Sequence, residues 1–459
     1  MVNFLMKICK FNFGEFEEQE FRKFLRMGMI FMLIIGFYWS LRPLKDSVFM
    51  QLVGKLWLPY AKTVSVLFML PFVAFYTTLV GKYSKEKVLM TMPAVYAVLV
   101  LVFAVFIFLA QSKICTIKFV TYTVGYLWYF FVESFGSVVI ALFWAFAADT
   151  TDPKTAKRGF PFVYAMGQFG GVLFPYVICS IPYWCNFTTD LASLLVLGGM
   201  ALCIPLLVKY FIKATPKELL TSFEKGAVDS AKQQKPKKGE AKFTEGLRLL
   251  FSHKYLICIF AANFIFEFIV TVFDFNFKVA AADAFSGIEL SQYLSKYATS
   301  VNIVSFVCLL CGVSNVTRFL GVGVALAAMP VVLGLALLGF LTMNSLNFLF
   351  ILMVGSKAIN YALNGPALKQ LYIPTTADVH FKAQAWIETF GSRASKEAGS
   401  LFNMLLKPMQ DWLGVAVGKA RYLMASGFIG FPLVALWFVV AVYLGKTFKK
   451  AVNENKVVC

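Results

Sequence analysis

The sequence predicts an all-α membrane protein with twelve transmembrane helices. Of its 459 residues, 59% are hydrophobic and 17% are aromatic, and the mean hydropathy is +0.73. Apolar runs long enough to cross a bilayer recur from one end of the chain to the other, which does not fit a soluble globular protein. Strict alternation of apolar and polar residues over ten-residue segments is absent, which argues against an outer-membrane barrel.

Twelve apolar segments are the expected spans. Each is long enough to cross about 30 Å of hydrocarbon at 1.5 Å per helical residue. The fourth is long and is expected to bend near Gly136, whereas the eleventh is barely hydrophobic and needs neighbouring helices to shield it. In chain order the spans are 24–43, 58–80, 88–110, 119–147, 160–182, 190–212, 255–277, 292–314, 318–342, 346–370, 384–407 and 422–445.

Between the sixth and seventh spans lies one long polar segment, which is rich in lysine between residues 232 and 238. Its composition is typical of a flexible linker, and it divides the spans into six plus six. The predicted organisation is an N-terminal cytoplasmic or interfacial segment (1–23), an N-terminal six-helix half (24–212), a basic cytoplasmic linker (213–254), a C-terminal six-helix half (255–445) and a cytoplasmic tail (446–459).

The net charge of +19 is explained mainly by topology. Cytoplasmic loops of membrane proteins carry excess Lys and Arg, and the N-terminus, the 81–87 and 149–159 loops, the linker and the tail all fall on one side. Both termini are therefore expected in the cytoplasm. Attraction of anionic substrates is a secondary cause, and nucleic acid is not expected as a partner.

The residues that cofactors and enzymatic chemistry need are sparse. Cys308 and Cys311 form a CxxC inside an apolar helix without a histidine nearby, so neither a metal nor a cofactor is expected. His253 and His380 are the only histidines, and no GxxxxGK[ST] loop for ATP hydrolysis is present. Six plus six spans with both ends inside is instead the organisation of a major-facilitator-like secondary transporter.

The polar stretch 355–400 is unusual in so apolar a chain. A cation in a membrane segment costs about 2.5–3.5 kcal/mol on insertion scales, so it usually faces a partner, a water-filled cavity or an anionic substrate. Lys357, Tyr361 and Asn364 fall on one helical stripe. Gly365-Pro366 then interrupts the helix, because proline lacks an N–H and clashes with the preceding turn.

Further along this stretch, Arg393, Lys396 and Glu397 lie within little more than one turn. Arg393 and Glu397 are four residues apart and are expected to pair, which would leave Lys396 free. We predict that the stretch 355–400 forms half of an anion-binding cavity.

Each charge within the spans of the first half has more than one interpretation. Glu133, in an apolar and aromatic span, is interpreted as a counter-ion to a cavity lysine, a substrate contact or a protonation site. Lys62 either extends its ammonium group to the interface or meets phosphate in a cavity. Arg42 either pairs locally with Asp46 or joins Lys45 in a cationic lip that attracts anions at the outer mouth.

In the second half, Glu267 and Asp274 are seven residues apart and share one helical face. Lys278 follows Asp274 by four residues and is expected to neutralise it, so Glu267 is the better functional candidate. Lys369 is either a topology charge near the membrane surface or a cavity lysine.

Lysines and arginines outnumber carboxylates among these candidates, which suits a substrate with several negative charges. Three aromatic residues precede Glu133 in the same span, namely Tyr126, Trp128 and Tyr129. They either stack on a ring of the substrate or simply pack between helices.

Five segments, spread over both halves of the chain and in the order that the family has them, resemble the nucleotide transporter family of obligate intracellular bacteria and plastids, whose best-known members exchange ATP for ADP. They are SLRPLKD (40–46), LPYAKTVSVLFMLPFVAFYTTLVGKYSKE (58–86), ESFGSVVIALFWAFA (133–147), SKAINYALNGPALKQLYIP (356–374) and GSRASKEAG (391–399). The resemblance implies a twelve-span, major-facilitator-like fold and places family functional residues at Lys62, Glu133, Lys357 and Lys396.

The chain departs from the family pattern at several of these positions. The aspartate of the family run falls on Gly365 and its essential lysine on Leu368, with Lys369 one residue later. The family glutamate of the seventh span falls on Val270, and Glu267, one turn earlier, is the candidate replacement. These departures bear on strict ATP/ADP exchange more than on nucleotide transport.

The sequence therefore predicts a nucleotide transporter, with ATP/ADP exchange by alternating access as the leading activity. The alternatives are proton-coupled or exchange transport of other nucleotides or a dinucleotide, transport of another organic anion, and a membrane-embedded enzyme, which the few histidines support poorly. A bacterial inner membrane is the expected location, and a monomer is the simplest state. The predicted substrate-binding residues are Lys62, Glu133, Glu267, Lys357, Asn364, Lys369, Arg393 and Lys396, with Arg42 and Lys45 at the outer mouth.

Overall fold

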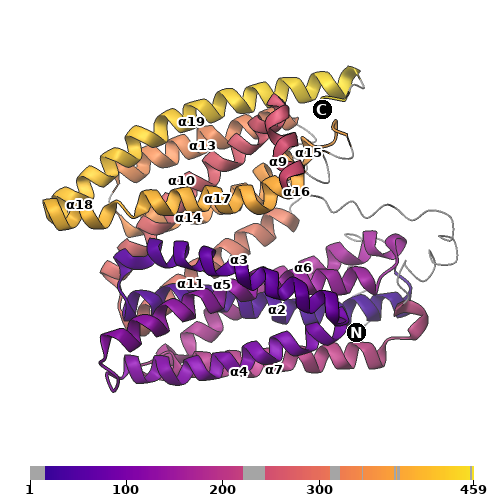
Figure 1. Cartoon of the computed structure of the whole chain (residues 1–459), viewed down its shortest axis with the longest axis horizontal. Helices are drawn as coiled ribbons and strands as arrows, with labels where there is room; N and C mark the ends of the chain where they lie inside the picture. The colour runs from indigo at the N-terminus through magenta and orange to yellow at the C-terminus, as the bar shows by residue number, and fades with distance from the viewer. Residues whose placement is uncertain are drawn as a thin grey trace. The chain divides into compact units, whose positions relative to one another are not determined.

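A computed structural model describes residues 16–220, 243–310, 321–343, 345–376, 379, 383–454 and 457–459. Most of the predicted N-terminal segment (1–15 of 1–23) and most of the predicted linker (221–242 of 213–254), with its lysine-rich run, lie outside the described residues. The described chain is almost entirely helical (Figure 1).

The chain forms two compact units. The first consists of Met1–Lys55, Val64–Pro236 and Ala284–Asn302, and the second of Leu56–Thr63, Lys237–Asp283 and Ile303–Cys459. Ala284–Asn302 of the first unit belongs to the predicted C-terminal half, and Leu56–Thr63 of the second unit belongs to the predicted N-terminal half. Both segments contribute side chains to the candidate site.

In the first unit, long helices follow one another with short connections (Figure 1). They are α2 (Glu18–Leu52), α3 (Leu58–Lys82, from Val64 onward), α4 (Lys85–Gln111), α5 (Lys118–Asp149), α6 (Pro153–Trp184) and α7 (Leu191–Ala214), followed by a 3₁₀ turn at Lys217–Leu220. The first part of α11 (Gly287–Leu310) completes this unit.

Helix α2 packs along α6, and it also contacts α5 and α7. Aromatic side chains of one helix fill the space over glycines of the other: an added Cβ at Gly36 would lie 2.2 Å from the Phe174 ring, and one at Gly167 would lie 2.4 Å from the Phe31 ring. Because small residues let helix backbones approach closely in a membrane, these glycines set the α2–α6 contact.

The first part of α11 is held to α2 and α6 by polar contacts. The hydroxyls of Ser47 and Ser291 are 2.6 Å apart, and the Gln51 side chain donates to the Gly287 carbonyl at 3.0 Å. The side-chain amide of Gln292 donates to Ser180 at 3.2 Å.

The second unit contains α9 (Phe243–Ser252), α10 (Lys254–Ala284), the remainder of α11, α13 (Val322–Thr342), α14 (Leu346–Ile359), α15 (Gly365–Gln370), α16 (Gln384–Trp386), α17 (Ser392–Asn403), α18 (Leu406–Leu413) and α19 (Val415–Glu454). Two π-helical turns, Asn360–Asn364 and Ile387–Gly391, interrupt the run from α14 to α15 and the run from α16 to α17. A 3₁₀ turn, Lys55–Trp57, precedes α3.

Among the described residues, nine helices are long and apolar enough to cross a membrane. They match the predicted spans except the eighth, tenth and eleventh. The eighth coincides largely with α11, and the other two contain the π-helical turns. The chain is therefore a multi-pass membrane protein, and the count of twelve spans stays a prediction.

Gly136, where the sequence suggests a bend, lies within the continuous helix α5. An added Cβ at this position would lie 2.3 Å from the Tyr38 ring. The glycine therefore accommodates a ring of α2 at the helix contact.

Candidate functional site

In the first unit, Lys45 of α2 and Glu133 of α5 form an ion pair and a hydrogen bond. Lys45 also lies 3.6 Å from the Asp46 carboxylate, and its ammonium group sits over the Tyr129 ring, 4.2 Å from the centroid. The Lys45 side chain is 5% exposed. This lysine therefore neutralises two acids inside the helix bundle, and Glu133 has the lysine counter-ion that the sequence suggests.

Glu133 is the more accessible member of this cluster, because its side chain is 36% exposed. On α2, the half-buried Arg42 places its guanidinium over the Trp39 ring at 4.7 Å and over the Tyr38 ring at 5.7 Å. Cation–π contacts of this kind stabilise a cation in an apolar setting and fix its direction.

The aromatic residues beside Glu133 mostly serve packing. Trp128 and Tyr129 are buried, and the Trp128 indole N–H donates to the Leu44 carbonyl at 3.4 Å. Tyr126 meets Phe49 edge-on at 5.3 Å. Of the two interpretations that the sequence allows, the structure favours packing for Trp128 and Tyr129.

In the second unit, cations gather around Asp274 of α10. Lys278, one turn further on the same helix, donates to its carboxylate at 2.5 Å, which confirms the predicted neutralisation. The ammonium group of Lys357, at the end of α14, lies 3.5 Å from the same carboxylate, and Lys62 of α3 also interacts with it electrostatically. Three lysines from three helices thus interact with this carboxylate.

A second cluster joins α10 to α17. The Lys396 ammonium group lies 3.4 Å from the Glu267 carboxylate, which also accepts a hydrogen bond from Ser392 at 3.2 Å. Glu397 accepts a hydrogen bond from the Thr63 hydroxyl of α3.

The expectation that Arg393 pairs with Glu397 and leaves Lys396 free is therefore wrong. Within the described part of the chain, no ion pair joins Arg393 to Glu397, and Lys396 has Glu267 as its partner. The reason is that α10 packs beside α17 and supplies a carboxylate to the face that carries Lys396. The Lys396 side chain remains 49% exposed, so it is accessible despite this contact.

The two π-helical turns lie in the stretch 355–400. In the first, Asn364 is 1% exposed and its amide donates to the Asn360 side chain at 2.8 Å. The Asn364 side-chain oxygen is buried without a hydrogen-bond partner among the residues that the structure describes. A π-helical turn inserts a residue into the helix and is frequent at functional sites.

The insertion rotates the side chains after Asn360 relative to their positions in a regular α-helix. The predicted stripe through Lys357, Tyr361 and Asn364 assumed a regular α-helix and is therefore altered. The Tyr361 side chain lies outside the described set. Lys369, in the last turn of α15, is exposed.

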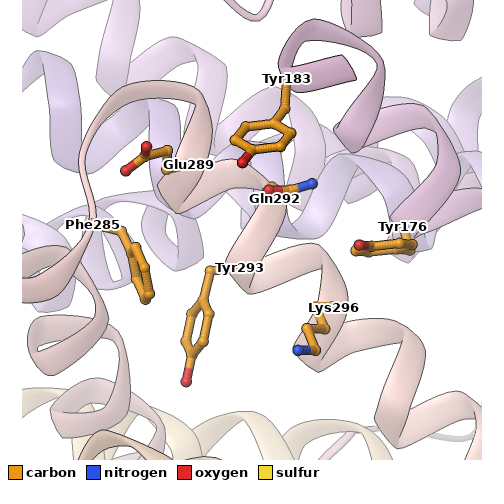
Figure 2. A pocket seen from close by; sticks show the side chains of 7 residues that line it. All are labelled: Tyr176, Tyr183, Phe285, Glu289, Gln292, Tyr293 and Lys296. Carbon is orange, nitrogen blue, oxygen red and sulfur yellow. The ribbon is translucent and has the colours of Figure 1, made fainter.

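An aromatic pocket in the first unit was not predicted from the sequence. Its volume is about 270 Å³, and Figure 2 shows Phe285 and Tyr293 side by side, with a centroid separation of 4.6 Å. Its lining residues are Tyr176 and Tyr183 of α6, Phe285, and Glu289, Gln292, Tyr293 and Lys296 of α11. The spacing of Glu289, Tyr293 and Lys296 on one face of α11 is the signal that could have revealed it.

Among the described residues, no three His, Cys, Asp or Glu side chains are grouped to hold a metal ion. The chemistry of both units is that of ammonium groups, carboxylates and aromatic rings. Such groups bind and release an anion without covalent change.

A family model described as TLC ATP/ADP transporter matches residues 109–352, slightly more than half of the chain. The protein named ADP,ATP carrier protein 3 of Rickettsia bellii (strain RML369-C) is 22% identical over 452 residues, covering 85% of this chain and 88% of that protein. The protein named ADP,ATP carrier protein 1, chloroplastic, of Arabidopsis thaliana is 23% identical over 492 residues, covering 95% of this chain and 75% of that protein.

Among solved structures, a bacterial homologue of the iron transporter ferroportin in an inward-facing state is similar, with a TM-score of 0.61 at 11% identity. The likeness covers 92% of this chain and 98% of that one. At this identity it shows the fold, and the chain has the all-α, major-facilitator-like architecture that the sequence predicts.

Proposed function

Because the chain belongs to the TLC ATP/ADP transporter family, we propose that it exchanges ATP for ADP across its membrane by alternating access. The names of its relatives, ADP,ATP carrier proteins of Rickettsia and of plastids, support nucleotides as the substrates. In alternating access, the substrate binds in a site that opens to one side of the membrane at a time.

The charges around Asp274 support this proposal most directly. Three lysines, Lys62, Lys278 and Lys357, interact with the Asp274 carboxylate, so this cluster brings several ammonium groups together. The phosphates of ATP and ADP carry several negative charges and can replace the carboxylate as partners. A lysine that passes from Asp274 to a phosphate keeps a counter-ion throughout, which avoids the penalty of an unpaired charge in the membrane.

We propose that the remaining predicted residues also interact with the substrate, and that the paired ones leave their present partners to do so. Lys396 would leave Glu267 for a phosphate, with Arg393 and Lys369 as further cations near the substrate's path. Asn364 would offer its unpartnered side-chain oxygen to the ribose or base. In the first unit, Glu133 would contact the substrate and would balance Lys45 when the site is empty, while Arg42 would attract incoming anions.

The principal alternative is proton-coupled uptake of other nucleotides. The accessible carboxylate of Glu133, 36% exposed, favours it, because such a group can bind and release a proton during the transport cycle.

Uptake of radiolabelled ATP into intact bacterial cells that express this chain tests the proposal. We expect uptake that requires ADP inside the cells and is unaffected by a protonophore. Uptake of other nucleotides that collapses with the protonophore would support the alternative. If no nucleotide is taken up although the protein is in the membrane, nucleotide transport is excluded.

In the same assay, Lys357→Gln should lower uptake at least tenfold, because one phosphate partner beside Asp274 is lost. Lys118→Gln, at the exposed start of α5, removes the same charge from a residue that belongs to neither cluster and should leave uptake unchanged. Equal uptake by the two variants would contradict the role of Lys357.

A further inference from the structure

A largely apolar groove runs between α13 and α19 in the second unit, and it has a volume of about 590 Å³. Small and branched apolar side chains line its walls, among them Ala327, Val331 and Val442. Lys446 and Lys449, which follow the apolar part of α19, also line it. No residue proposed above for nucleotide binding belongs to this groove.

The groove exists because two glycines hold the helix backbones together at one point. An added Cβ at Gly445 would lie 2.6 Å from the Cα atom of Gly323. Small side chains on α13 beyond this contact leave the space between the helices unfilled. Further along, Leu337 and Leu341 pack over Gly430 and Gly427, so the two antiparallel helices meet again there.

The length of the groove matches one leaflet of a bilayer. Its lining on α13 extends from residue 323 to residue 332, which is about 14 Å at 1.5 Å per residue. This is about half of the 30 Å hydrocarbon core of a membrane. The groove is therefore long enough to extend from a membrane surface, where the lysines would lie, to about the middle of the bilayer.

The charge at the surface end is uncompensated. In the part of the chain that the structure describes, neither Lys446 nor Lys449 forms an ion pair. Nearby, the ammonium group of Lys254 lies over the Tyr443 ring at 5.4 Å and adds a third positive charge to this end of α19.

We propose that this groove binds an anionic phospholipid, with one acyl chain between α13 and α19 and the phosphate held by Lys446 and Lys449. The apolar walls fit a hydrocarbon chain, the length fits one leaflet, and the two lysines fit a negatively charged headgroup. The bound lipid fills the space that the small residues leave, and it thereby stabilises the α13–α19 pair.

Native mass spectrometry of the full-length protein in detergent tests this proposal, with phosphatidylglycerol and phosphatidylethanolamine added in separate titrations. We expect phosphatidylglycerol to be retained preferentially and to raise the melting temperature. Lys446→Gln and Lys449→Gln should each weaken phosphatidylglycerol retention about fivefold. Lys450→Gln removes the same charge from the same helix outside the groove and should have little effect.

Ala327→Leu places a larger side chain in the groove while both lysines remain, and it should also lower retention. Equal retention of the two lipids by the unaltered protein would overturn the proposal, as would equal losses in Lys446→Gln and Lys450→Gln. These readouts require no transport, so they are independent of the proposed nucleotide exchange. If Ala327→Leu fails to fold, the exposed lysine variants still decide the outcome.

Discussion

At the scale of single residues, the buried charges of this protein are arranged in unequal groups. Lys45 faces two carboxylates, Glu133 and Asp46, whereas Asp274 faces several lysines. In a medium of low dielectric, removing the shared member of such a group takes a counter-ion from every other member at once, which costs more than removing one of the others. The shared members are therefore the residues on which each cluster depends.

This asymmetry predicts an order of stabilities for variants of the first cluster. Lys45→Met removes at once an ammonium group that Glu133 and Asp46 share and should destabilise the protein by about 3 kcal/mol or more. Glu133→Gln keeps the Lys45–Asp46 pair and should cost only about 1 kcal/mol. The double variant should be more stable than Lys45→Met alone. Thermal unfolding in detergent measures the order, and a Lys45→Met variant as stable as Glu133→Gln would contradict it.

At the scale of elements, the helices of each unit are set by glycines and by breaks in regular helix. Gly36 and Gly167 bring α2 and α6 together around phenylalanine rings. The π-helical turn Asn360–Asn364 comes directly before Gly365-Pro366, where proline cannot supply a backbone N–H. The interruption that the sequence predicts is thus present as a π-helical turn. Asn364, the last residue of this turn, is buried.

A matched pair of glycine substitutions tests the packing of α2 against α6. An added Cβ at Gly170 would lie 2.2 Å from the Met32 carbonyl oxygen, whereas one at Gly199, in α7, meets nothing within 4 Å. Gly170→Ala should destabilise the protein by about 1–3 kcal/mol, because backbone must shift to accept the methyl group. Gly199→Ala should be neutral or slightly stabilising. Melting temperatures in detergent distinguish them, and equal values would argue against close α2–α6 packing.

At the scale of the whole molecule, the charge distribution sets the expected orientation. The excess of lysine and arginine in alternate loops predicts cytoplasmic termini. We propose that the chain resides in a bacterial inner membrane in this orientation. The lysines at the end of α19 would then lie at the cytoplasmic leaflet, where anionic lipids attract them.

Reporter fusions test this orientation. A reporter that is active only in the cytoplasm should be active when fused after Lys449 and inactive when fused after Lys113, in the connection between α4 and α5. A reporter that is active only outside the inner membrane should give the reverse pattern. If the reporter that is active only in the cytoplasm were active at both positions, the connection that contains Lys113 would not lie outside the inner membrane, and the proposed orientation would be wrong.

Much of the fold could be predicted because hydropathy and loop charge are local properties of the chain. The sequence predicted the helical membrane class, the positions of the apolar helices and the polar stretch 355–400. It also predicted the Asp274–Lys278 pair, because residues four apart on a helix are neighbours whatever the tertiary structure.

The partners of distant charges could not be predicted in this way. That Lys45 meets Glu133, that Lys396 meets Glu267, and that Lys62 and Thr63 join the clusters of the second unit depend on which helix faces pack together. The aromatic pocket and the α13–α19 groove likewise form only where remote helices meet. The sequence by itself therefore determined which residues are out of place in a membrane, and the tertiary structure decided what each of them contacts.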